Sequence, residues 1–295
     1  MKKLGFFLLC IAILSSPKLT AQETLQYNLT KGQRFKVSQR AVQEFVQVID
    51  SVESKATNTV TGVTTWTVDQ VLEDKYILLT SFESIRLKTE SEIYGVLYDI
   101  NTDASSDSLD VQSEIFRGLV NIPFTVILLK TGEVEAIKGS SALVENMILQ
   151  SGIEDENVKK IIRESMDGQF GDISLASSIE QMTFMFPTEK VKVGGTWEND
   201  YVGDLEAHNV WNLDSYNQNE YVISGKASVL MKMDDASGRM TLEGAQTTHA
   251  TIDNVSGLFN EVIVHQNVQG TSVIPDVGNQ EMPTKLTATI TYKRL

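Results

Sequence analysis

The sequence has 295 residues and a formal net charge of −14 at neutral pH. So acidic a surface repels phosphate backbones and anionic lipid surfaces, which excludes nucleic acid as an expected partner. The single cysteine, Cys10, lies within the first 21 residues. Beyond that segment the composition therefore excludes a disulfide scaffold, a cysteine nucleophile and a thiolate metal site.

The first 21 residues have the pattern of a cleavable signal peptide. Lys2 and Lys3 precede an apolar run over residues 5–14, which is too short to span a bilayer, and the small residue Ala21 suits the cleavage site. Cys10 lies inside the apolar run rather than at its end, so we expect no lipid anchor. We predict a soluble, monomeric mature protein without a membrane span, located in the periplasm or outside the cell.

The next part of the chain predicts β-strands. Phe35, Val37 and Ala41 alternate with charged and polar residues, and this period of two predicts a long half-buried strand over residues 35–49. Further strands are expected at 60–71, 76–87 and 91–100. The turn-like residues 130–133 predict a hairpin between strands at 124–129 and 134–137.

The middle of the chain changes to helical spacing. Apolar residues recur every three or four positions over 143–148 and 158–166, which predicts two helices. Acidic residues at 154–156 precede the basic ones, as the helix dipole favours, and Gly168 is expected to close the second helix. A third short helix is expected after Asp172.

Strands are expected again after Pro187, at 197–202, 209–213, 221–233, 240–253, 258–268 and 285–292. The order strands, helices, strands lacks the alternation typical of a parallel sheet, so we predict an antiparallel, β-rich α+β fold. The expected parts are an N-terminal β-module (22–139), a helical segment (140–185) and a C-terminal β-module (186–295). Together they are expected to form one unit, a curved half-barrel-like sheet with helices on its concave face.

The two β-rich parts share a faint sequence pattern. Each contains a Trp followed ten residues later by a Tyr: Trp66 and Tyr76 in the first, Trp211 and Tyr221 in the second. Glycine-containing turns precede and follow both pairs. A duplicated module explains the pattern through aromatic residues paired across strands. Coincidence between strands rich in Thr and Val remains the alternative.

No catalytic motif is present among the three histidines, His208, His249 and His265, or around the serines and glycines. His249 and His265 lie in expected strands and could meet across a sheet, although exposed strand histidines are the expected outcome. We predict no cofactor and favour a binding or structural role over catalysis. A hydrolase that acts on a sugar or peptide with paired carboxylates remains the alternative.

The region from Asp99 to Asp110 has oxygen-bearing side chains at alternate positions, as in a calcium loop. The candidate ligands are Asp99, Asn101, Asp103, Ser105, Asp107 and Asp110. Ala104 stands where such a loop needs glycine, and Asp110 replaces the bidentate glutamate. We therefore predict a polar surface loop without a metal, since Asp, Asn and Ser also favour loops for their own hydrogen bonds.

Several motifs together resemble a known family. They are residues 29–35 (LTKGQRF), Tyr98-Asp99, residues 124–128 (FTVIL) with the glycine turn that follows, and Phe186-Pro187 followed by residues 191–197 (VKVGGTW). The sequence resembles an exported bacterial family catalogued only as a domain of unknown function. The resemblance covers nearly the whole chain after residue 21 and implies no functional residues.

The expected architecture suggests one specific binding role. A curved antiparallel sheet with helices on its concave side can hold a lipid-like ligand between the two layers. We therefore expect an apolar or amphipathic small molecule as the leading candidate partner.

Overall fold

The computed structural model describes residues 22–49, 52–104, 111–235, 238–273 and 280–295; the expected signal peptide, residues 1–21, lies outside them. Twelve strands form one sheet. They are β1 (Arg34–Ile49), β2 (Val52–Val71), β3 (Lys75–Ser91), β4 (Gly95–Asn101), β5 (Phe124–Leu129), β6 (Val134–Lys138), β7 (Thr196–Tyr201), β8 (Leu205–Tyr216), β9 (Glu220–Asp235), β10 (Gly238–Asp253), β11 (Phe259–Val273) and β12 (Glu281–Arg294). The helices are α1 (Val111–Arg117), α2 (Ser141–Ser151), α3 (Glu156–Phe170) and α4 (Asp172–Thr183).

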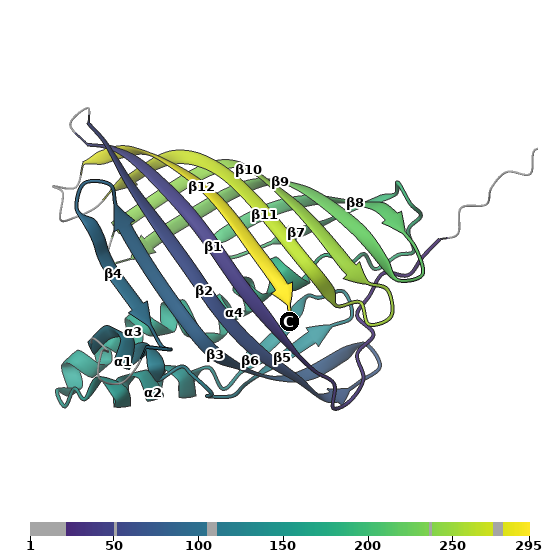
Figure 1. Ribbon diagram of the computed structural model, residues 1–295, viewed down its shortest axis with the longest axis horizontal. Coiled ribbons are helices and arrows are strands. Elements are labelled where there is room, and N and C mark those ends of the chain that lie inside the picture. The colour runs from purple at the N-terminus through teal and green to yellow at the C-terminus, as the bar shows by residue number, and fades with distance from the viewer. Residues whose placement is uncertain (1–21, 50–51, 105–110, 236–237, 274–279) are drawn as a thin grey trace, which may run out of the picture.

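The strand order is β6-β5-β3-β2-β1-β12-β11-β10-β9-β8-β7, with β4 paired to β3 outside this path. All pairings between these strands are antiparallel. Figure 1 shows the first and last strands side by side in the middle of the sheet. The antiparallel β-dominant α+β class is therefore confirmed, and all twelve strands belong to a single sheet.

Alternating sequence explains why these segments are strands. In β8, the residues that alternate along one side are buried, from Leu205 through Trp211 to Leu213, and those between them are mostly exposed. Successive side chains of a strand point to opposite faces, so one face joins the core and the other meets water. The same alternation over residues 35–49 correctly predicted β1.

The two Trp-containing hairpins have matching geometry. In the first, the Gly32 amide donates to the Val68 carbonyl (2.8 Å), and Phe35 pairs with Trp66 across the strands. In the second, the Gly194 amide donates to the Leu213 carbonyl (2.8 Å), and Trp197 pairs with Trp211 across the strands. Counted from the β7 edge of the sheet, β7 to β11 follow one another as a first meander. Strand β12 comes next, and β1, β2, β3, β5 and β6 follow as a second meander. Both five-strand meanders therefore run in the same sense around the sheet.

Helix α4 links the two edges of the sheet. The Val134 amide of β6 donates to Glu180 (2.9 Å), and Thr183 donates to the carbonyl of Gly132 in the turn before β6 (2.7 Å). On the other edge, Trp197 and Asn199 of β7 donate to the carbonyls of the residues that directly follow α4 (3.0 and 2.7 Å). The apolar side of α4 therefore lies across the inner face of the sheet.

The other helices gather at one end of the molecule (Figure 1). Helix α2 buries Leu143 and Met147, whereas α3 has no fully buried residue. Asp155 caps α3 by accepting from two backbone amides, as the acidic start of this segment suggested. The prediction that Gly168 ends α3 was wrong, because the helix continues to Phe170 and the chain turns at Gly171.

We predict that Gly225→Ala destabilises the protein by about 1–3 kcal/mol because of overpacking. A Cβ at this position would lie 2.6 Å from the Trp211 ring, which is buried and cannot retreat because its indole donates to Asn199 (2.8 Å). Urea unfolding measures the change.

The matched control is Gly168→Ala in α3, where a Cβ meets nothing within 4 Å. Alanine there should stabilise the protein by about 0.5–1 kcal/mol through helix propensity. Equal effects of the two substitutions would contradict the packing of Trp211 on Gly225.

Candidate ligand-binding cavity

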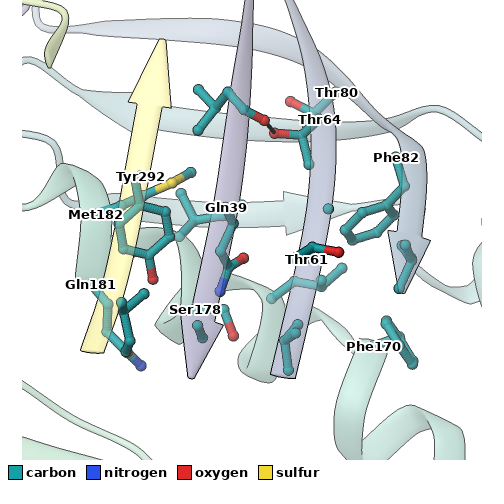
Figure 2. A pocket seen from close by; sticks show the side chains of 18 of the residues that line it. Gln39, Thr61, Thr64, Thr80, Phe82, Phe170, Ser178, Gln181, Met182 and Tyr292 are labelled. Carbon is teal, nitrogen blue, oxygen red and sulfur yellow. Dashed lines mark hydrogen bonds between the residues drawn. The ribbon is translucent and has the colours of Figure 1, made fainter. Parts of the chain in front are cut away.

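A cavity of about 330 Å³ lies between the sheet and the helices. Strands β1, β2, β3 and β12 form one side, with Phe124 of β5, and the end of α3 together with α4 forms the other (Figure 2). Its volume is at the lower end of the range of about 300–1,000 Å³ that small-molecule sites occupy. Exposed Gln169 and buried Thr80 both line it, so the cavity extends from the surface into the interior.

Apolar and aromatic side chains form most of the lining. They are Val37, Ala41, Val60, Trp66, Phe82, Ile85, Leu87, Phe124, Phe170, Leu175, Ile179, Met182 and Ile290. The Phe82 ring contacts two other aromatic rings, with its centre 5.8 Å from that of Phe124 and 6.3 Å from that of Phe170. Helix and sheet therefore meet through aromatic edges at this end of the cavity, which suits a hydrocarbon ligand.

Polar side chains gather on another side of the cavity. We call Gln39 of β1, Ser178 and Gln181 of α4, and Tyr292 of β12 the polar wall. Figure 2 shows the Gln39 amide and the Tyr292 hydroxyl directed toward the α4 residues. Tyr292 is only 4% exposed, and burial raises the pKa of its hydroxyl, so this group stays a neutral donor at physiological pH.

Strand register explains why the polar wall has room beside it. Gln39 pairs with Tyr292 on one neighbouring strand and with Gly62 on the other. Gly62 offers no side chain, so space remains next to the Gln39 amide. A side chain at position 62 would approach the Ser84 carbonyl to 3.1 Å, so the sheet itself is tight there.

One hydroxyl that lines the cavity lacks a partner. Thr80 of β3 is 2% exposed, and its Oγ1 makes no hydrogen bond in the described part of the chain. Its neighbour in the cavity, Thr64, is satisfied: it accepts from the Trp66 indole (2.8 Å) and donates to the Val37 carbonyl (3.5 Å). An unpaired buried hydroxyl costs about 1–3 kcal/mol, which a ligand could recover.

Only Gln39 of the polar wall has a recognisable signal in the sequence, which is its position along β1. Gln39 and Gln43 share the inner face of β1 with Val37 and Ala41 because all four positions have the same parity. The alternation of apolar and polar residues that predicted β1 places polar residues on the outer face of the strand, so it does not reveal these two glutamines on the inner face. Ser178 and Tyr292 carry no local signal, since only tertiary structure brings them to Gln39.

The calcium candidates are described only in part. Asp99 lies in β4, where both of its oxygens accept from Arg86 (2.8 and 2.7 Å), and this pairing holds the pKa of Asp99 below its usual range. Asn101 accepts from the Asp103 amide (3.0 Å). The other candidates, Ser105, Asp107 and Asp110, lie outside the described residues, so the metal-free surface loop stays a prediction. Among described residues, no group of three His, Cys, Asp or Glu could hold a metal ion.

The histidines lie on exposed positions of the sheet. His249 and His265 are on adjacent strands, but His249 pairs with Ile263 and His265 with Thr247, so they are two residues out of register. His208 contacts Asp200 through Nδ1 (2.8 Å), and this hydrogen bond raises the pKa of His208. None of the three lines the cavity.

The chain belongs to a family of unknown function, DUF6263, whose model matches residues 73–259. The resemblance to a domain of unknown function is thereby confirmed. No curated protein matches the chain. Within the described residues, no helix has the length and apolar character needed to cross a bilayer.

The fold is similar to that of a solved structure. One described as "lipid-protein interactions in lipovitellin" is 10% identical, with a TM-score of 0.50 over 91% of this chain. The match spans 25% of the lipovitellin chain, and at this identity it shows the fold alone. DynF, from the dynemicin biosynthesis pathway of Micromonospora chersina, is 7% identical over 98% of this chain and 92% of its own. Its TM-score of 0.25 is too low to support a statement about fold.

We predict that Thr80→Val stabilises the ligand-free protein by about 1 kcal/mol, because it removes an unpaired buried hydroxyl without changing the side-chain shape. Thr64→Val is the matched control and should destabilise by about 1–3 kcal/mol, because it leaves the Trp66 indole without its acceptor. Chemical denaturation measures both. Destabilisation by Thr80→Val would show that its hydroxyl has a partner.

For the loop that begins at Asp99, we expect calcium and magnesium to raise the melting temperature equally. Both ions screen the acidic surface, and neither is expected to bind a defined site. Asp103→Ala should leave both shifts unchanged. A calcium-selective rise that this variant abolishes would establish a calcium site, since a bound ion stabilises the folded state by mass action.

Proposed function

We propose that this protein binds and carries an apolar or amphipathic small molecule in the cavity between its sheet and α4. The observation that carries the proposal is the lining itself, which is largely apolar, has a cluster of neutral polar groups on one side, and contains no charged side chain. Sites for small hydrophobic ligands combine an apolar surface with a few placed polar groups in the same way.

The lipovitellin likeness is consistent with this proposal. Its description speaks of lipid–protein interactions in that protein, and the shared fold covers 91% of this chain. A curved sheet offers a long concave face, and here α4 and the end of α3 cover the part of it that forms the cavity. Such an arrangement leaves space between layers where an apolar ligand avoids water.

A hydrolase with paired carboxylates is the alternative function. The cavity gives it no support, because neither Asp nor Glu contributes to its lining. Glycoside hydrolysis by the usual route needs two carboxyl groups that flank the scissile bond. Binding is therefore the function that the cavity favours.

Two further statements belong to this proposal. We infer export to the periplasm or the exterior, supported by the charged start and apolar run within residues 1–21. We also infer that the two meanders are related modules, supported by the matching hydrogen bonds of Gly32 and Gly194 and by their common direction around the sheet. Protein of native sequence that stays in the cytoplasm with residues 1–21 attached would contradict the first inference.

We predict that Ala41→Leu weakens binding of the fluorescent probe N-phenyl-1-naphthylamine about tenfold or more. Ala41 is buried on β1 and lines the cavity, so a larger side chain occupies ligand space. Overpacking of this kind costs about 1–3 kcal/mol. Fluorescence titration measures the affinity, and circular dichroism confirms that the variant is folded.

Arg40→Leu is the control. Arg40 adjoins Ala41 on β1 but is exposed on the opposite face, so the probe should bind this variant as it binds the native protein. Native mass spectrometry of protein from its own source should also show a retained ligand that Ala41→Leu loses. Equal probe affinity in both variants would exclude this cavity as the binding site.

A further inference from the structure

The polar groups of the cavity are all uncharged. Its polar side chains are Gln39, Gln43, Thr61, Thr64, Thr80, Gln169, Ser178, Gln181 and Tyr292, and no Lys, Arg, His, Asp or Glu lines it. This is notable in a chain with 25 basic and 39 acidic residues. A charged ligand group that enters the cavity would lose part of its hydration and find no counter-charge in the lining, which is more costly than burial of a neutral group that finds hydrogen bonds.

The polar wall can satisfy a neutral group from several directions. The amides of Gln39 and Gln181 both donate and accept, and so does the hydroxyl of Ser178. Figure 2 draws no hydrogen bond among these side chains or to Tyr292, so their capacity is available to a ligand. A ligand hydroxyl or amide matches the polar wall because it can both donate and accept hydrogen bonds. A ligand ester matches it because its oxygens accept from these neutral donors.

Long-range electrostatics act against anionic ligands as well. The net charge of −14 repels carboxylates and phosphates before they reach the cavity. The same charge attracts cations, but the lining offers them no carboxylate, so the attraction ends at the surface. The net charge of the protein therefore disfavours the approach of anions, and the uncharged lining disfavours the binding of both anions and cations.

We infer that the cavity selects an amphipathic ligand with an uncharged hydrogen-bonding head, which the polar wall binds, and a hydrocarbon tail that lies against the aromatic side of the cavity. This inference rests on the proposed function and specifies its ligand class. Fatty alcohols, acylglycerols and fatty amides belong to the class, whereas ionised fatty acids, phospholipids with charged heads and alkylammonium ions do not.

Three ten-carbon compounds test the inference on the full mature protein: decan-1-ol, decanoate and decylammonium. Each compound is titrated as a competitor of N-phenyl-1-naphthylamine at pH 7.5. Decanol should bind at least tenfold more tightly than either ion, because the ions lose hydration without gaining a partner. Decanoate should bind more tightly as the pH falls toward 5, since the neutral acid forms, whereas decanol affinity should not change.

Variants of the polar wall identify the residues that bind the head group. Gln39→Met and Tyr292→Phe keep the side-chain shape and should each weaken decanol about 2- to 10-fold, the range expected for one lost neutral hydrogen bond. Gln269→Met, at an exposed position of β11 away from the cavity, should leave decanol binding unchanged. The affinity of the probe for each variant gives the effect on apolar binding alone, which should be small.

The outcomes separate the inference from the proposed function. Probe binding with equal or tighter binding of decanoate or decylammonium overturns the neutral-head inference and leaves the proposed function standing. If both Gln39→Met and Tyr292→Phe bind decanol as tightly as the native protein does, the neutral-head inference is also overturned, because another surface must then bind the head group. Failure of the folded protein to bind the probe and all three compounds overturns both statements.

Discussion

The pairing of β1 with β12 is the interaction on which the rest of the structure depends. It joins the first strand to the last from Val37–Arg294 to Gln47–Thr284 and turns two meanders into one sheet. Without it, each meander would expose a long edge of unpaired amides and carbonyls, which promotes aggregation. The same seam builds the cavity, because it sets Gln39 beside Tyr292 and Ala41 beside Ile290. Fold and proposed ligand site therefore rest on the same register.

The place of the helical segment in the chain determines where the cavity is covered. The segment lies between β6 and β7, which are the two ends of the strand order. To connect them, the chain must pass from one edge of the sheet to the other, and α4 makes this crossing over the inner face. Hydrogen bonds from Thr183 to the turn before β6, and from Tyr201 of β7 to the Phe184 carbonyl (3.1 Å), hold its end in place. A helix fixed at the sheet edges can cover a curved face without filling it.

The sequence predicted the elements well because their signals are local. An expected strand overlaps each strand of the sheet, although β2 begins at Val52 rather than at residue 60, and helical spacing located α2 to α4. The end of α3 was misplaced because a helix tolerates glycine in its interior, as at Gly168, whereas the helix ends and the chain changes direction at Gly171. The cavity could not be predicted because Gln39, Ser178 and Tyr292 are far apart in sequence. Only the β1–β12 register and the crossing of α4 bring them together, and neither leaves a short-range pattern.

Polar residues elsewhere on the concave face show why this cavity is the ligand site to test. Gln246 accepts from Gln266 (2.7 Å), and Ser272 shares a hydrogen bond with Thr284 (2.7 Å), so polar groups buried away from the cavity pair with one another. Such satisfied pairs cost the fold little and need no ligand. Among the described residues, two buried side-chain atoms lack a partner, the Thr80 hydroxyl and the Tyr221 hydroxyl. Tyr221 lies outside the cavity, with its ring stacked on another tyrosine, whereas Thr80 lines it. The unpaired Thr80 hydroxyl, the polar wall and an open volume therefore belong to one cavity on the inner face, and its polar wall offers hydrogen bonds to the head of a neutral amphipathic molecule.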